Sequence, residues 1–144
     1  MVMTEAPSAL AIKQIDTMLS RRANAKLEKL GVTLSQVAAL RAIASHPEGQ
    51  AAFKELESDL DVSQPTVAGL IGRLKAKELV DVFDSEETLN AKVVALTGEG
   101  RAVIETSRED MELEDETMFS GFTDEERAAF ASMVERIAEN LREK

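Results

Sequence analysis

Residues 63–97 read SQPTVAGLIGRLKAKELVDVFDSEETLNAKVVALT, and this stretch decides the fold. Ser63 suits the N-cap of a helix, and Pro65 fits its first turn because the amide that proline lacks would have no helical partner there. The apolar residues of this helix recur at helical spacing, at Val67, Leu70, Ile71 and Leu74. Two short β-prone runs, 79–83 and 92–96, follow with a polar segment between them. The stretch therefore predicts an amphipathic helix followed by a β-hairpin.

A short helix is predicted directly before the capped one. Residues 53–60 carry three apolar side chains on one side, and residues 61–62 form a tight turn. A short helix, a tight turn and a capped second helix before a hairpin are the layout of a winged helix-turn-helix, which reads DNA by laying the second helix in the major groove. A structural helix pair without DNA contacts also fits the helix pattern, but the hairpin favours the DNA-reading module.

Two more helices are predicted on the N-terminal side. Apolar and basic residues interleave at helical spacing over residues 8–30, and Gly31 ends this first helix. Thr33 or Ser35 caps a second helix that runs to about Ser45. Its expected buried stripe consists of Leu34, Val37, Leu40 and Ile43.

Two long helices are predicted on the C-terminal side. Thr97 caps a fifth helix through about Phe119, with few apolar residues and an acidic stretch at 109–116. Thr123 and Glu126 match a capping box that opens a sixth helix. The sixth helix carries an apolar stripe formed by Phe130, Met133, Val134, Ile137, Ala138 and Leu141. We expect this apolar stripe to be covered by another surface. Either it packs against a second chain in a dimer, or the helix folds back on the core of its own chain.

Composition restricts the class of protein. The 144 residues suffice for one core, and 44% apolar with 31% charged residues fit a folded, helix-rich chain. The absence of cysteine excludes a disulfide scaffold, thiolate metal sites and cysteine-based redox sensing, and His46 has no second histidine with which to bind a metal. The sequence offers no Ser/His/Asp set with usable geometry and no nucleotide-binding glycine loop, so we expect no enzyme, cofactor or metal. Without a membrane-length apolar run or a signal-peptide pattern, we expect a cytoplasmic protein with no membrane partner.

Charge is distributed unevenly along the chain. Residues 1–32 hold five bases and three acids, residues 33–105 hold seven and twelve, and residues 106–144 hold five and twelve. Much of the net charge of −10 therefore lies beyond the predicted DNA-reading helix. The overall acidity does not exclude a nucleic-acid partner, because basic residues remain close to that helix.

The solvent face of the helix after Ser63 carries the candidate DNA contacts. Gln64 matches the edge of adenine, Thr66 suits a phosphate or a thymine methyl group, and Arg73 suits guanine or the backbone. Lys75 and Lys77 extend this surface toward the phosphates.

Five segments, in order along the chain, resemble the MarR family of bacterial transcription regulators. They are LSQVAAL (34–40), SQPTVAGLIGRL (63–74), LV (79–80), LTGEGR (96–101) and FTDEE (122–126). The resemblance covers about residues 8–142 and implies a winged helix-turn-helix flanked by dimerisation helices. It places an N-terminal dimerisation helix at 1–32, a DNA-binding domain at 33–100 and C-terminal dimerisation helices at 101–144. The expected fold class is mainly α with a small β-hairpin wing.

The resemblance also implies partners and site residues. It implies a homodimer on a palindromic DNA site and, often, repression that a small aromatic or phenolic ligand relieves. It assigns DNA contacts to Ser63, Gln64, Thr66, Arg73 and the wing, whose one base is Lys92. The positive charges near the helix add Lys75 and Lys77 to the expected DNA-binding residues. The residues expected at the dimer interface are Leu10, Ile15, Met133, Ile137 and Leu141.

The predicted wing departs from the family pattern. Residues 81–92 carry four acids and one base, whereas the family commonly shows an Asp-x-Arg pattern with arginines entering the minor groove. Gly69 is a second departure, since the family usually has an arginine or a similar polar residue there. Acids near phosphates add repulsion, so we expect weak or very salt-sensitive DNA binding, unless the wing tip swings clear of the DNA.

The sequence therefore predicts a DNA-binding transcription regulator that acts as a homodimer on a palindromic operator, as a repressor with a small-molecule effector. The alternative is a winged-helix protein that has lost strong DNA binding and acts through protein–protein interaction, with its acidic wing on a basic partner.

Overall fold

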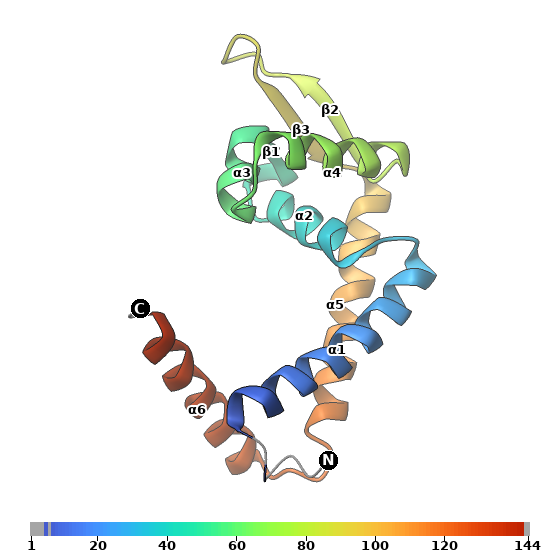
Figure 1. Cartoon of the computed structure of the whole chain (residues 1–144). Helices are drawn as coiled ribbons and strands as arrows, with labels where there is room; N and C mark the ends of the chain where they lie inside the picture. Colours follow the sequence, from blue (N-terminus) through green and yellow to red (C-terminus); the bar gives the residue numbers. More distant parts are fainter. Residues whose placement is uncertain (1–4, 6, 143–144) are drawn as a thin grey trace. The chain divides into compact units, whose positions relative to one another are not determined.

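The computed structural model describes residue 5 and residues 7–142, which form six α-helices and one three-stranded antiparallel sheet (Figure 1). The helices are α1 (Ser8–Leu30), α2 (Leu34–Ala44), α3 (Phe53–Leu60), α4 (Gln64–Ala76), α5 (Gly98–Met118) and α6 (Asp124–Arg142). The strands are β1 (Gln50–Ala52), β2 (Val80–Asp84) and β3 (Lys92–Leu96), and η2 (Pro47–Gly49) is a short 3-10 turn. The predicted fold class, mainly α with a hairpin wing, is confirmed.

The described residues fall into two compact units, one ending at Arg108 and the other beginning at Glu109. The first unit holds α1 to α4, the sheet and the start of α5, and the second holds the end of α5 and all of α6. None of the described helices combines the length and the apolar character that crossing a bilayer would need.

The predicted helix ends are confirmed by their hydrogen bonds. Gly31 ends α1 in the left-handed region, at φ 73°, which a residue without a Cβ adopts at little cost. The Thr33 hydroxyl accepts from the Gln36 amide, while the Gln36 side chain accepts from the Thr33 amide, both at 3.2 Å. Thr123 and Glu126 make the same reciprocal pair at the start of α6, at 3.1 and 2.9 Å. Each capping box satisfies amides that the first turn of a helix leaves unpaired.

The core of the first unit lies between α2, α3, α4 and the sheet. Its largest fully buried side chains are Leu40, Ile43, Leu56, Ile71, Leu74, Val67, Val80 and Val94. The expected stripe of α2 was wrong at one position, because Leu34 is 46% exposed. The buried face of α2 is centred on Gln36, Leu40 and Ile43, and at about 100° per residue Leu34 lies nearly opposite that centre.

Strand β3 is the centre of the sheet. It pairs with β2 from Val80 opposite Leu96 to Asp84 opposite Lys92, which forms the predicted hairpin. On its other side it pairs with β1, where Ala51 lies opposite Val94. The sequence interpretation treated 50–52 as linker, because two alanines and a glutamine carry little strand propensity. This segment becomes a strand through its pairing with β3.

The start of α5 lies against the backbone before β2. The Thr97 amide donates to the carbonyl oxygen of Leu79 at 3.1 Å, and the Thr97 hydroxyl accepts from the Gly100 amide at 3.0 Å. A Cβ on Gly100 would lie 2.1 Å from the Leu79 carbonyl oxygen, closer than van der Waals contact permits. Glycine at this position therefore allows α5 to follow the hairpin directly.

Candidate nucleic-acid interface

Helix α4 begins at a well-defined cap. The Ser63 hydroxyl oxygen accepts from the Thr66 amide at 3.4 Å and lies 3.0 Å from the Thr66 hydroxyl. Pro65 occupies the first turn, as predicted. The cap holds Ser63, Gln64 and Thr66 together at the N-terminal end of the helix, where backbone amides and the helix dipole favour an anion such as phosphate.

The two faces of α4 differ in burial. Val67, Ile71 and Leu74 are between 0% and 2% exposed and anchor the helix in the core. The predicted contact residues Gln64, Thr66 and Arg73 are all exposed, together with Gly69. The Arg73 guanidinium extends back along the helix, with Nη1 4.0 Å from where a Cβ of Gly69 would lie. Thr66, Gly69 and Arg73 recur at helical spacing, so a hydroxyl and a guanidinium lie on one exposed face. The Gln64 amide is exposed on the other side of the first turn. All three groups can donate to base edges and phosphates.

A groove of about 810 Å³ lies between the start of α2 and α4. Helix α2 lines it with Ser35 and Ala38, and α4 lines it with Thr66, Gly69 and Arg73. The sequence interpretation did not assign α2 to the site. Thr33 and Gln36 match the capping-box spacing, but that pattern marks the start of a helix and not a binding surface.

The predicted lysine contacts differ in their surroundings. Lys75 is exposed near the end of α4. Lys77 is also exposed as a residue, but its ammonium donates to the carbonyl oxygen of Gly31 at 2.5 Å and to Gln36 Oε1 at 2.8 Å. Lys92 Nζ lies 2.6 Å from Asp84 Oδ1, at the last strand pair before the tip of the hairpin. Among the three, Lys75 is therefore the simplest candidate for a phosphate contact.

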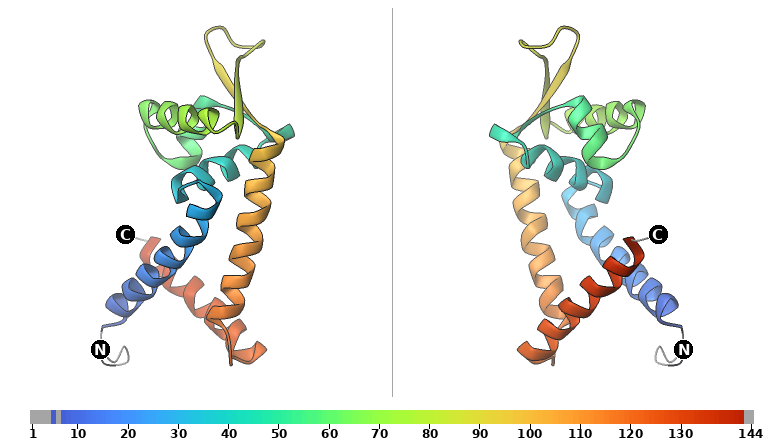
Figure 2. Two further views of the ribbon diagram at one scale, coloured as in Figure 1. Left: turned by 90° about the vertical axis from the view of Figure 1, so that its right-hand side faces the viewer. Right: turned by 90° about the vertical axis from the view of Figure 1, so that its left-hand side faces the viewer.

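The β2–β3 hairpin projects beyond α4 as a wing (Figure 2). The Ser85 hydroxyl organises its tip by accepting from the amides of Glu87 and Thr88, at 3.2 and 3.1 Å. The four acids of the wing, Asp81, Asp84, Glu86 and Glu87, are exposed, and the side chain of Leu89 is 90% exposed at the tip. Lys92 is the only base among residues 81–92 of the wing, and its ammonium forms an ion pair with Asp84.

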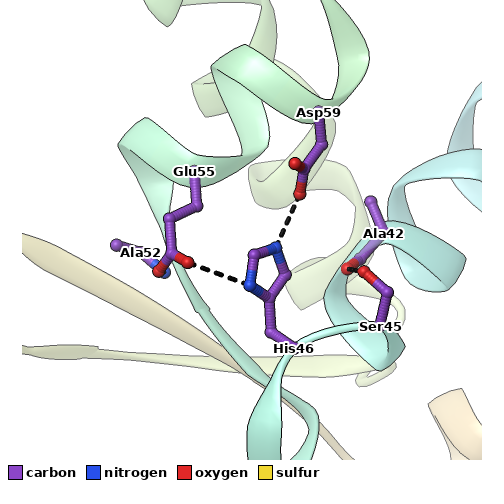
Figure 3. A network of polar contacts seen from close by, with 6 residues as sticks. All are labelled: Ala42, Ser45, His46, Ala52, Glu55 and Asp59. Carbon is purple, nitrogen blue, oxygen red and sulfur yellow. Dashed lines mark hydrogen bonds and ion pairs between the residues drawn. The ribbon is translucent and has the colours of Figure 1, made fainter.

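His46 lies between two carboxylates of α3 (Figure 3). Its Nε2 is 2.6 Å from Asp59 Oδ2, and its Nδ1 is 2.9 Å from Glu55 Oε2. The hydrogen bond with Asp59 raises the pKa of His46, and the charges of both carboxylates add to this, against the opposing effect of burial. Glu55 also accepts from the Ala52 amide at 3.0 Å. Over the described residues no cluster of three or more ligand side chains is placed to hold a metal ion, and His46 joins the end of α2 to α3 instead.

The residues predicted for a dimer interface are exposed in the single chain. In α1, Leu10 is 46% and Ile15 is 43% exposed. In α6, Met133 is 56%, Ile137 is 45% and Leu141 is 71% exposed, and no described residue of this helix is buried. Each helix thus presents an apolar surface that the single chain leaves open to solvent.

Comparison with known proteins identifies relatives across most of the chain. A model of the MarR family matches residues 30–88, from the end of α1 to the wing. The uncharacterized HTH-type transcriptional regulator YwoH of Bacillus subtilis is 30% identical over 122 residues, which are 85% of this chain and 87% of that protein.

Solved structures share the fold. The Staphylococcus aureus MepR–DNA complex is 20% identical with a TM-score of 0.78, over 95% of this chain and 99% of that chain. BpsR of Bordetella bronchiseptica, whose structure addresses regulation of its DNA binding by 6-hydroxynicotinic acid, is 25% identical with a TM-score of 0.60, over 87% and 98% of the two chains. The family and its structural neighbours are regulators of transcription and not enzymes, in agreement with the sequence prediction.

Proposed function

Because the chain belongs to the MarR family of transcription regulators, we propose that it binds a palindromic DNA operator as a homodimer. In this proposal residues 33–100 read the DNA, while residues 1–32 and 101–144 supply the dimerisation helices. Two copies of α4 would then enter successive major grooves, since a two-fold symmetric protein matches a palindromic site.

The exposed polar face of α4 is the observation that carries this proposal. Core packing holds the opposite face, so the exposed side chains are presented on a rigid element. Gln64 pairs with adenine, Thr66 contacts a phosphate or a thymine methyl group, and Arg73 contacts guanine or the backbone. Ser63, Lys75 and Lys92 add contacts to phosphates. Lys92 makes its contact by giving up the ion pair with Asp84 in favour of a phosphate.

Regulation by a small molecule is the second part of the proposal. The chain acts in the bacterial cytoplasm as a repressor, and a small aromatic ligand releases it from DNA. BpsR, a structural relative whose DNA binding is regulated by 6-hydroxynicotinic acid, supports this class of effector.

Fluorescence anisotropy with the DNA that flanks the gene for this protein tests the proposal. At about 50 mM salt the wild type should bind, and Arg73→Ala should weaken binding by about tenfold or more, because losing a bidentate base contact costs about 1–3 kcal/mol. Arg136→Ala, at an exposed arginine of α6, serves as the matched control and should bind like the wild type. A folded dimer that does not bind at this salt concentration would contradict the proposal.

The acidic wing favours a second candidate function. Four exposed acids and the exposed Leu89 suit a basic protein partner better than a phosphate backbone. In that case the chain has lost strong DNA binding and acts through protein–protein contact. Absence of DNA binding by a folded dimer, together with binding of a basic partner that Glu86→Lys abolishes, would favour this function over the first.

A further inference from the structure

Lys77 ends the recognition helix α4 and turns its charge toward the protein. Its backbone amide donates to the carbonyl oxygens of Arg73 and Leu74, both at 3.2 Å, which closes the last turn. Its ammonium donates to the Gly31 carbonyl oxygen at 2.5 Å and to Gln36 Oε1 at 2.8 Å. Two of the three donors of the ammonium are therefore used within the chain.

Both acceptors belong to helix ends. Gly31 is the left-handed residue that terminates α1, and the carbonyl end of a helix carries a partial negative charge that favours a cation. Gln36 is 4% exposed, and its side-chain oxygen already accepts from the Thr33 amide at 3.2 Å as part of the cap of α2. One ammonium thus joins the end of α1, the start of α2 and the end of α4.

We propose that Lys77 is a positioning residue, which sets the direction of α4 relative to α1 through the Gly31 carbonyl and Gln36. This inference rests on the proposed function, in which α1 belongs to the dimerisation helices and α4 reads a half-site. The separation of the two α4 helices must match the separation of the two half-sites. A bond between α4 and the end of α1 therefore limits which half-site spacing the dimer accepts.

Lys75 provides a matched comparison on the same helix. It is exposed two residues earlier, and the sequence interpretation assigned both lysines to DNA. A lysine that contacts a phosphate contributes about one unit to the slope of log affinity against log salt. A lysine that only positions the helix contributes to affinity without contributing to that slope.

The first experiment compares Lys77→Met with Lys75→Met in anisotropy titrations between about 50 and 200 mM salt. We expect Lys75→Met to lower the salt slope by about one unit. We expect Lys77→Met to weaken binding by about tenfold at every salt concentration with an unchanged slope, because it loses charged hydrogen bonds inside the protein. A slope that falls by about one unit in Lys77→Met would overturn the inference and return Lys77 to the phosphate contacts.

The second experiment varies the operator. Starting from a DNA fragment that the wild type selects, one base pair is inserted between or removed from the half-sites. The wild type and Lys75→Met should both lose affinity steeply at the altered spacings. Lys77→Met should lose much less, since its α4 is held less tightly to α1. Equal sensitivity in the two variants would show that Lys77 does not set the spacing.

The third experiment needs no DNA and separates this inference from the proposed function. Urea unfolding of Lys77→Met, Gln36→Leu and the double variant forms a double-mutant cycle. The two substitutions should be non-additive, with Gln36→Leu costing less when Lys77 is already replaced. Additive effects would overturn the contact itself. Non-additive effects in a protein that binds no DNA would instead show a real contact and a failed functional proposal.

Discussion

At the scale of single residues, His46 places a titratable group between the end of α2 and α3, the first helix of the helix-turn-helix. A neutral imidazole has only one N–H, whereas both ring nitrogens of His46 lie within hydrogen-bonding distance of a carboxylate. The arrangement therefore suits the doubly protonated ring. This agrees with the raised pKa of His46, for which the hydrogen bond with Asp59 is the largest cause.

The raised pKa predicts how stability changes with pH. The unfolded chain has the ordinary histidine pKa of about 6.5, and the folded value is higher. The stabilisation by His46 is therefore complete below about pH 6.5 and is lost as the pH rises through the folded pKa. Urea unfolding of the wild type across this window should show that loss, and His46→Gln should remove it.

Asp59→Asn is the matched variant for this titration. It removes the main cause of the raised pKa while retaining the ring. Because His46 is the only histidine, its imidazole proton resonances follow the titration without ambiguity. The same pH dependence in His46→Gln and the wild type would assign the effect to other groups.

At the scale of elements, the wing has the shape of a DNA-reading hairpin but an unfavourable charge. Its register and its ordered tip make it a defined structure, and the exposed acids lie on that structure. Repulsion from phosphates then depends on how closely the tip approaches DNA, since charges in water are screened beyond about 10 Å at 0.1 M salt.

Reversing the charge of the tip tests that approach. Glu86→Lys combined with Glu87→Lys should tighten DNA binding at low salt and steepen its salt dependence, because two repulsive charges become attractive. Glu109→Lys combined with Glu116→Lys makes the same change in net charge at exposed positions of α5. Equal affinity in anisotropy titrations of both double variants would place the wing tip away from the DNA.

The elements that the sequence predicted well are those with local signals. The caps of α2, α4 and α6 each depend on residues three positions apart, so their hydrogen bonds follow from spacing alone. Strand β1 was not predicted, because it depends on pairing with β3 about forty residues later. The shared exposed face of Thr66 and Arg73 follows from the helical period, but whether these residues contact DNA stays a prediction.

The partners of charged side chains were also beyond sequence reasoning. Lys77 and Gly31 are 46 residues apart, and His46 and Asp59 are 13 apart. No periodic pattern relates such positions, because the packing of several helices brings them together. The sequence therefore identified Lys77 as a cation near the site but could not show that its ammonium is bound within the chain.

At the scale of the whole molecule, the apolar surface of α6 predicts the oligomeric state. Met133→Glu combined with Ile137→Glu should convert the proposed dimer into a monomer, since burying two unpaired charges in an interface is unfavourable. Sedimentation equilibrium measures the change, and DNA affinity should fall with it. Ser132→Glu, at an exposed position on the opposite face of α6, should leave the dimer intact. A monomeric wild type at micromolar concentration would contradict the proposal.

The exposed stripe of α6 also determines how the protein would respond to its own abundance. If two chains must meet through this stripe before either α4 reads its half-site, the concentration of competent dimer rises with the square of the free monomer concentration. Halving the free monomer would then lower the dimer about fourfold, so the operator would empty over a narrow range of protein level. In that case the apolar face of one helix would make promoter output a threshold response to the number of chains per cell.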